Sequence, residues 1–306
     1  MKKRYIRHAS ELVTCKGSAP KHGKEMSDIG LIKDGAVIIH DDKIVAVGTT
    51  EELDKQVNDE YEVIDATGKT VMPGFVDSHT HFIFGGYRAD EFSWRLKGDS
   101  YMSIMERGGG INATVVPTRE ASLEELMETG EERLNRMLEF GVTTVEGKSG
   151  YGMDCETELK MLRAMKNLNE KHPVDIVSTF LGPHSVLPEW KGKEREFLDE
   201  QLNHVMPIVK EEGLAEFADI FTEKNVFSVE DSEYYMTKAK EMGFKLKIHA
   251  DEIYQLGGSE LAARVGAVSA DHLLKASDER CRSYQYHSSV NRIWFKRRIC
   301  TGKKND

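Results

Sequence analysis

The first 70 residues alternate short apolar runs with turns, a pattern that predicts β-strands. We expect strands at residues 35–40, 43–48, 62–65 and 70–72. The first two are rich in β-branched side chains and are separated by Asp41 and Asp42, which tolerate a tight turn, so they predict a hairpin. A segment of this size buries little apolar surface alone. We therefore predict a small β-sandwich-like domain over residues 1–70 that packs on the rest of the chain.

From residue 75 onward, apolar runs of strand length alternate with amphipathic helical segments. The six predicted strands cover residues 75–76, 141–146, 174–180, 217–221, 244–249 and 267–272. Alternating strands and helices imply a parallel sheet, either a closed barrel or an open doubly wound sheet. No Gly-x-Gly-x-x-Gly follows the first strand, and polar residues stand at many strand ends. These two features favour the α/β barrel, whose sites form at the carboxyl ends of its strands.

Capping signals mark the predicted helices. Ser122-x-x-Glu125 is a capping box that opens one helix, and Gly141 follows its end. Ser228-x-x-Asp231 opens another. The expected buried stripe of the first helix consists of Leu123, Leu126, Leu134, Met137 and Leu138.

Histidines cluster at the ends of the predicted strands. His79 and His81 follow the first strand at positions i and i+2, a spacing that points both rings to the same face. Imidazole is the commonest neutral ligand for zinc and similar cations, although two hydrogen-bonded histidines without a metal would look the same. Five of the eleven histidines occupy such positions: His79, His81, His184, His249 and His272. Because a barrel gathers all strand ends on one rim, we expect these side chains to converge.

Three of these histidines predict a metal site. His79, His81 and His249 would supply three neutral nitrogens and leave a position open, as catalytic zinc requires. Such a cation lowers the pKa of a water molecule toward 7. His272 or Glu252 could then transfer protons or polarise the bond under attack. Imidazoles suit zinc and iron equally, so we expect one divalent metal of either kind.

Several stretches also resemble a known family. Residues 73–81, Pro-Gly-Phe-Val-Asp-Ser-His-Thr-His, resemble the first-strand signature of the metal-dependent amidohydrolase superfamily. Within that superfamily, the imidazolonepropionase family is similar at residues 84–92, 108–111, 148–152, 182–184, 249–252 and 270–272. The resemblance runs from about residue 5 to residue 279 and is specific, because separate loops of the rim match together.

The resemblance implies a fold and a reaction. The fold is an amidohydrolase-type (β/α)8 TIM barrel over residues 71–279, and the reaction is hydrolytic opening of 4-imidazolone-5-propanoate to N-formimidoyl-L-glutamate. The implied metal ligands are His79, His81 and His249, the substrate contacts are Arg88, Tyr151, His184 and Glu252, and the residues that flank the attacked carbon are Glu252 and His272.

The residues themselves support parts of this assignment and leave alternatives open. Arg88 has the planar fork that binds a propionate carboxylate in two places, but it could equally form an ion pair with Asp90 or Glu91. Tyr151 stands between two glycines, where its hydroxyl could reach a ligand or its ring could simply pack.

Two loop features have similar alternatives. Residues 108–110 are three glycines, which permit positive φ or close backbone approach to a ligand and also suit a plain flexible loop. Glu252 could flank the substrate or merely cap the helix after the fifth strand.

Charge and cysteine content limit the partners. The formal net charge of −10 argues against nucleic acid or an anionic membrane as the main partner, and no apolar run approaches the roughly 18–20 residues that span a bilayer. The basic start lacks the apolar core of a secretory signal. Four cysteines without Cys-x-x-Cys spacing predict a cytoplasmic protein. A homodimer that buries part of the barrel exterior would be ordinary.

Residues 280–306 break the pattern. They hold eight Lys or Arg against one acid, a charge of +7, whereas residues 1–279 carry 34 basic and 51 acidic residues, a charge of −17. The family's barrel has eight strands and a metal-binding Asp after the eighth, neither of which this sequence matches. Our hypothesis is a shifted reading frame after about residue 279. The alternatives are thus an active imidazolone hydrolase, an inactive metal-binding fragment of one, or a related hydrolase of nucleobases or other cyclic amidines.

Overall fold

The computed structural model describes residues 2–17, 21, 23–99, 103–104 and 107–276. The chain divides into two compact units, residues 1–74 and residues 75–306. The predicted basic tail at 280–306, together with the hypothesis of a shifted reading frame, lies outside the described residues.

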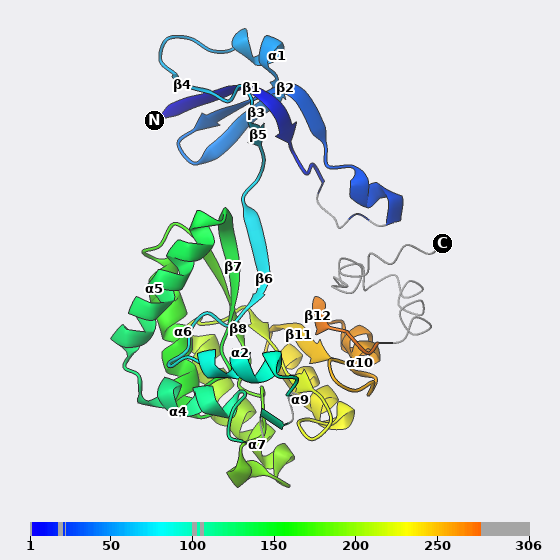
Figure 1. Ribbon diagram of the computed structural model, residues 1–306. Coiled ribbons are helices and arrows are strands. Elements are labelled where there is room, and N and C mark those ends of the chain that lie inside the picture. Colours follow the sequence, from blue (N-terminus) through cyan, green and yellow to red (C-terminus); the bar gives the residue numbers. More distant parts are fainter. Residues whose placement is uncertain (1, 18–20, 22, 100–102, 105–106, 277–306) are drawn as a thin grey trace. The chain divides into compact units, whose positions relative to one another are not determined.

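The first unit is built on one mixed sheet with strand order β3-β2-β1-β4, and β5 also pairs with β1 (Figure 1). Its elements are β1 (Lys3–Val13), a 3-10 turn (Gly23–Ser27), β2 (Leu31–His40), β3 (Lys43–Thr49), α1 (Thr50–Asp54), β4 (Glu62–Asp65) and β5 (Thr70–Val71). The predicted hairpin is confirmed as β2 and β3, and Asp41 in its turn has a φ of +51°. The long strand β1, which we did not single out in the sequence, holds the sheet together because β2, β4 and β5 all pair with it.

The second unit contains a curved, wholly parallel sheet. Its strands are β6 (Phe75–Thr80), β7 (Val142–Lys148), β8 (Asp175–Phe180), β9 (Phe217–Ala218), β10 (Phe221–Thr222), β11 (Lys245–Ala250) and β12 (Ser269–His272). β9 and β10 both pair with β11, so they form one interrupted strand with Asp219 and Ile220 between its halves. Counted in this way, the described residues hold the six predicted strand positions of an eight-position barrel. The fold is an incomplete (β/α) barrel over the described residues.

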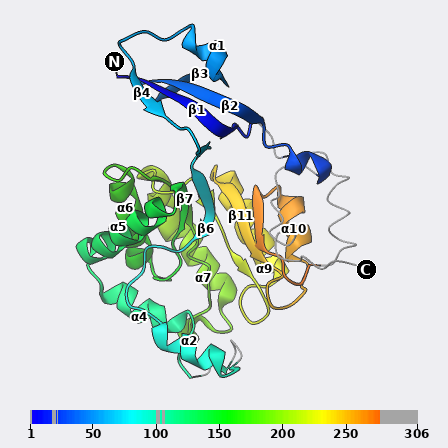
Figure 2. The same ribbon diagram turned by 45° about the horizontal axis from the view of Figure 1, so that its top comes forward.

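Helices follow the strands and flank them (Figures 1 and 2). The described helices are α2 (Ala89–Leu96), α4 (Asn112–Glu120), α5 (Leu123–Glu139), α6 (Cys155–Asn169), a 3-10 turn (Pro188–Trp190), α7 (Glu194–Glu200), a π-helical turn (Gln201–Val205), α8 (Met206–Glu211), α9 (Val229–Glu241) and α10 (Gly258–Val265). Among the described residues, no helix is both long enough and apolar enough to cross a membrane.

The predicted capping box at the start of α5 is confirmed. Ser122 Oγ accepts the Glu125 N–H at 3.1 Å, and Glu125 Oε2 accepts the Ser122 N–H at 2.8 Å. The predicted stripe is wrong at one position, because Leu138 is 36% exposed. Twelve residues of α-helix turn it about 120° around the axis from Leu126, away from the core.

The apolar core of this unit lies between the sheet and its helices. Large buried side chains include Val145 on β7, Phe180 on β8 and Ile248 on β11. Because the strands are parallel and in register, with Ala250 opposite both Thr222 and His272, their carboxyl ends meet at one edge. The polar residues that follow the strands are thereby brought together.

Candidate active site

One cavity of about 890 Å³ opens at the carboxyl ends of the strands. Its lining includes all eight residues singled out in the sequence: His79, His81, Arg88, Tyr151, His184, His249, Glu252 and His272. A concave pocket with a few convergent polar groups is the usual form of a small-molecule site. The structure therefore brings together residues that lie up to 193 positions apart in the sequence.

The other four histidines surround His249, the penultimate residue of β11. Its ring centroid lies 4.8 Å from that of His79, 5.9 Å from His81, 5.6 Å from His184 and 5.0 Å from His272. The expected convergence of the histidines is thus observed.

The described residues contain three groups with ligand atoms within 4.8 Å of one another, and all three include His249. They are His79–His249–His272, His81–His184–His249 and Asp219–His249–Asp271. The predicted ligands are divided between the first two groups: His79 and His249 belong to the first, and His81 and His249 to the second. The His81 ring stacks on that of His184, with 4.7 Å between their centroids.

The predicted set His79–His81–His249 is not among these three groups, although its rings are neighbours. The centroids of His79, His81 and His249 are separated by 4.8, 5.7 and 5.9 Å. Three imidazoles bound tetrahedrally at about 2.1 Å place their centroids roughly 5 Å apart. Two of the three separations are wider than this, so side chains would have to move for all three rings to bind one cation.

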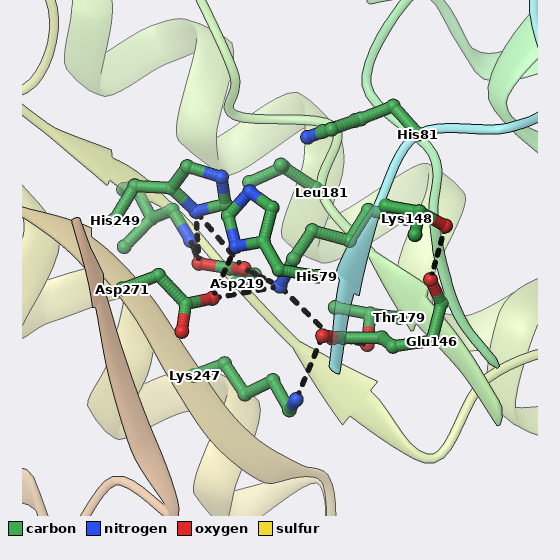
Figure 3. A network of polar contacts seen from close by, with 12 residues as sticks. His79, His81, Glu146, Lys148, Thr179, Leu181, Asp219, Lys247, His249 and Asp271 are labelled. Atoms are coloured by element: carbon green, nitrogen blue, oxygen red, sulfur yellow. Dashed lines mark hydrogen bonds and ion pairs between the residues drawn. The ribbon is translucent and has the colours of Figure 1, made fainter. Parts of the chain in front are cut away.

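Hydrogen bonds fix the orientation of these three rings, and Figure 3 shows those of His79 and His249. His79 Nδ1 lies 2.9 Å from Asp271 Oδ2, His249 Nδ1 lies 3.1 Å from Asp219 Oδ1, and His81 Nδ1 lies 3.3 Å from the Ser149 carbonyl oxygen. Carboxylates and carbonyls only accept, so each Nδ1 carries the proton and each Nε2 keeps its lone pair. Within the described residues, His249 Nε2 is buried and has no hydrogen-bond partner. A metal ligand requires this arrangement, so the residues fit a cation.

Burial lowers the pKa of four imidazoles of the cavity. It lowers the pKa of His184 and of His272 to about 3 each, and the neighbouring His249 adds to both effects. Burial also holds the pKa of His81 well below its ordinary value and lowers that of His79, where Asp271 partly opposes it. Neutral imidazole is the form that binds metal.

A buried network of charges lies below the rings, and our sequence reasoning did not include it in the site. Lys148 Nζ is 2.8 Å from Asp219 Oδ2, 2.9 Å from Glu146 Oε1 and 3.1 Å from Asp271 Oδ2. A signal was present for two members: Glu146 and Lys148 are the two charged residues of this strand and, two positions apart, share one face. Asp219 carried no such signal, because it interrupts the strand that β9 and β10 form.

Arg88 lies at the mouth of the cavity, just before α2. Its Nη1 is 3.9 Å from Glu91 Oε2, a loose ion pair that leaves most of its donors for other partners. Glu91 has a second task, since its Oε1 accepts the Gly110 N–H at 2.7 Å. Gly110 has a φ of +68°, and a Cβ at Gly109 would meet Glu91 Oε1 at 2.9 Å. The backbone of the glycine run at residues 108–110 thus closely approaches Glu91, a residue of the protein, and not a ligand.

Tyr151 packs among the rings at one side of the cavity. Its centroid lies 5.2 Å from His81, 5.5 Å from His184 and 5.9 Å from Phe84. His184 Nδ1 donates to the Gly150 carbonyl oxygen at 3.0 Å, so the loop that carries Tyr151 also orients His184.

Glu252 and His272 face each other, with 3.6 Å between Oε2 and Nε2. Burial raises the pKa of Glu252, although the nearby His249 opposes this. The alternative that Glu252 caps the next helix is wrong, because Asp251 performs that task. Its Oδ1 accepts the Leu256 N–H at 2.9 Å and its Oδ2 accepts the Ser259 N–H at 3.0 Å.

Comparison with known proteins gives the family. A profile of the amidohydrolase family matches residues 62–114. The chain is 54% identical over 275 residues to an imidazolonepropionase of Clostridium tetani, with 90% of this chain and 66% of the relative covered. It is 51% identical over 288 residues to an imidazolonepropionase of Porphyromonas gingivalis, with 94% of this chain and 68% of the relative covered. The chain belongs to the imidazolonepropionase family. It spans about two thirds of the length of the curated relatives it matches.

Solved structures show a similar fold. A 5-methylcytosine deaminase from Klebsiella pneumoniae is similar with a TM-score of 0.62 and 16% identity, covering 94% of this chain and 64% of that one. Guanine deaminase of E. coli is similar with a TM-score of 0.59 and 15% identity, covering 93% of this chain and 64% of that one. At these identities the likeness concerns the fold alone.

Proposed function

We propose that this member of the imidazolonepropionase family hydrolyses 4-imidazolone-5-propanoate to N-formimidoyl-L-glutamate with the help of one divalent metal, zinc or iron. The observation that carries the proposal is the shared cavity, in which five histidines and Arg88 face one space. A small cyclic substrate with a carboxylate tail matches both parts of this lining.

The metal would be held by His79, His81 and His249 through Nε2. A cation bound there supplies Lewis acidity and lowers the pKa of a water molecule, which makes a nucleophile available near neutral pH. The buried position of His249 Nε2 without a protein partner supports this assignment over a purely structural role for the ring.

Glu252 would transfer protons, and His272 would bind the substrate beside it. The raised pKa of the Glu252 carboxyl suits a group that takes up a proton at Oε2 and returns it to the leaving nitrogen. His272, neutral because of its lowered pKa, would hydrogen-bond to the substrate rather than repel the cation. The 3.6 Å between the two groups lets both reach one reacting carbon.

Arg88, Tyr151 and His184 would bind the substrate. The Arg88 guanidinium can take the propionate in a bidentate pair. The rings of Tyr151 and His184, 5.5 Å apart, would border the flat imidazolone ring. A homodimer and a cytoplasmic location stay predictions.

The test combines metal analysis of the purified chain with a ring-opening assay. The assay monitors the loss of imidazolone absorbance. We expect one metal per chain and measurable turnover, and His249→Ala should lose both. His204→Ala is the matched control, because the His204 side chain is 65% exposed and pairs only with Glu200 among the described residues. Stoichiometric metal without turnover would favour the inactive fragment.

A second variant tests the substrate. Arg88→Ala should raise KM for 4-imidazolone-5-propanoate by at least tenfold, since a charged hydrogen-bonded pair is worth about 1.5–3 kcal/mol. An unchanged KM in Arg88→Ala would instead favour a nucleobase or another cyclic amidine as the substrate.

A further inference from the structure

Lys148 is a fully buried lysine behind the candidate metal site. Its side chain has 0% exposure and lies among the carboxylates of Glu146, Asp219 and Asp271, all within 3.1 Å of Nζ (Figure 3). A buried ammonium is costly unless it is paired and hydrogen-bonded, and here all three Nζ protons have a carboxylate partner. Burial alone would lower the pKa of Lys148, but Asp219, Asp271 and Glu146 outweigh it and raise that pKa.

Two of these carboxylates each bind Lys148 and one histidine. Asp219 accepts from Lys148 at Oδ2 (2.8 Å) and from His249 Nδ1 at Oδ1 (3.1 Å). Asp271 Oδ2 takes both Lys148 (3.1 Å) and His79 Nδ1 (2.9 Å). One ammonium is therefore joined through two anions to two of the three proposed ligands.

The same contacts distinguish among the three candidate cation groups. The Asp219–His249–Asp271 group already has a counter-ion, because the Lys148 ammonium stands between its two carboxylates. An added cation is therefore directed to the opposite edge of the imidazoles, where Nε2 of His249 is unpartnered among the described residues.

The network continues to a second lysine. Glu146 Oε1 accepts from Lys148 at 2.9 Å and from Thr179 Oγ1 at 2.5 Å, while its Oε2 is 2.9 Å from Lys247 Nζ. Within the part of the chain that the structure describes, Lys247 forms an ion pair with Glu146 and with neither of the two aspartates. A Lys→Met substitution at Lys247 is therefore a control, because its hydrogen-bond connection to the histidines runs through Glu146 and Lys148.

We propose that Lys148 is a positioning residue for the metal site: its ammonium fixes the carboxylates of Asp219 and Asp271, which in turn hold the rings of His249 and His79 with Nε2 toward the cavity. Without Lys148, two buried anions face each other with no counter-ion, and their repulsion turns them away from the rings they orient. The inference rests on the proposed function, because it requires that these histidines bind a cation.

The experiment compares Lys148→Met with Lys247→Met in the full 306-residue chain. Co²⁺ serves as the probe, with its affinity measured by competition with a chromophoric chelator and its coordination read from the visible d–d bands. We expect Lys148→Met to bind Co²⁺ 10- to 100-fold more weakly, the usual effect of losing an outer-shell partner, and to change the d–d bands. Lys247→Met should change the affinity less than threefold and leave the bands as in the parent chain.

The outcomes separate this inference from the metal site itself. A folded Lys148→Met chain with parental affinity and bands overturns the inference and leaves the metal site standing. Equal losses in the two lysine variants also overturn it, because they would reflect general loosening of the network. A parent chain that binds no Co²⁺ overturns the metal site and this inference together.

A double variant covers the case in which Lys148→Met does not fold. Lys148→Met combined with Asp219→Asn keeps the net charge of the cluster, which removes the main reason for unfolding. Since Asp271 and His79 still depend on Lys148, the double variant should bind Co²⁺ at least threefold more weakly than Asp219→Asn alone. Equal affinities of these two variants would contradict the role of Lys148.

Discussion

Gly150, just after β7, shows how a single backbone position shapes the site. Its φ is +104°, and a Cβ there would meet the Leu181 carbonyl oxygen at 2.6 Å and His184 Cβ at 2.9 Å. The glycine thus lets the loop approach closely enough for its carbonyl to accept from His184. An added methyl would push against backbone that has no room to yield.

We predict that Gly150→Ala lowers the free energy of unfolding by about 2–4 kcal/mol, the sum of positive-φ strain and overpacking. Gly98→Ala is the matched control, since Gly98 has a φ of +94° and nothing within 4 Å of its added Cβ, and we expect a loss of about 1–2 kcal/mol there. Urea unfolding of both variants measures the difference. Equal losses would show that the contact with Leu181 and His184 adds nothing to the strain.

At the scale of elements, two carboxylates hold the segment between β11 and α10: Glu223 accepts the N–H groups of Ile253 and Tyr254, and Asp251 binds the part next to α10. Asp251 accepts N–H bonds from Leu256, Gly257 and Ser259, together with the Ser259 hydroxyl. Because Glu252 is the next residue, this clamp also sets the direction of the proposed proton-transfer group.

We predict that Asp251→Asn destabilises the chain by about 2–3 kcal/mol, because an amide places N–H groups against the donors that the carboxylate accepts. Asp231→Asn, at the start of α9, should cost less than about 1 kcal/mol, since its ion pair with Arg195 is partly exposed. Denaturant midpoints compare the two variants. A loss at Asp231 as large as that at Asp251 would refute the special role of the Asp251 clamp.

The same scale shows what sequence could and could not predict. The six strand positions, the capping box at Ser122 and the convergence of the histidines follow from local patterns, because the barrel topology fixes where strand ends meet. The break at Asp219 could not be foreseen, since it arises from tertiary contacts of Asp219 with Lys148 and His249. Glu146 and Lys148 were visible as polar residues in a strand, but only the fold shows that their partners come from β11 and β12 and from the break between β9 and β10.

For the whole molecule, metal binding is expected to stabilise one of the two compact units and not the other. All proposed ligands lie in residues 75–306: His79 on β6, His81 directly after it and His249 on β11. Residues 1–74 form a separate unit with its own sheet and small apolar clusters. A ligand stabilises only the structure that must be folded to bind it, by about 2.7 kcal/mol at a hundredfold excess over Kd. The two units are therefore expected to respond differently to metal.

We predict that saturating Zn²⁺ slows amide hydrogen exchange in β6, β7, β11 and β12 and leaves exchange in β1, β2 and β3 unchanged. A chelator should reverse the effect, and His249→Ala should abolish it, because loss of one imidazole removes the differential affinity for the folded unit. Exchange followed by mass spectrometry resolves the two sets of peptides within one sample. If protection rose equally in both units, the metal would be acting on the chain as a whole, and binding at the rim of the barrel could not be its cause.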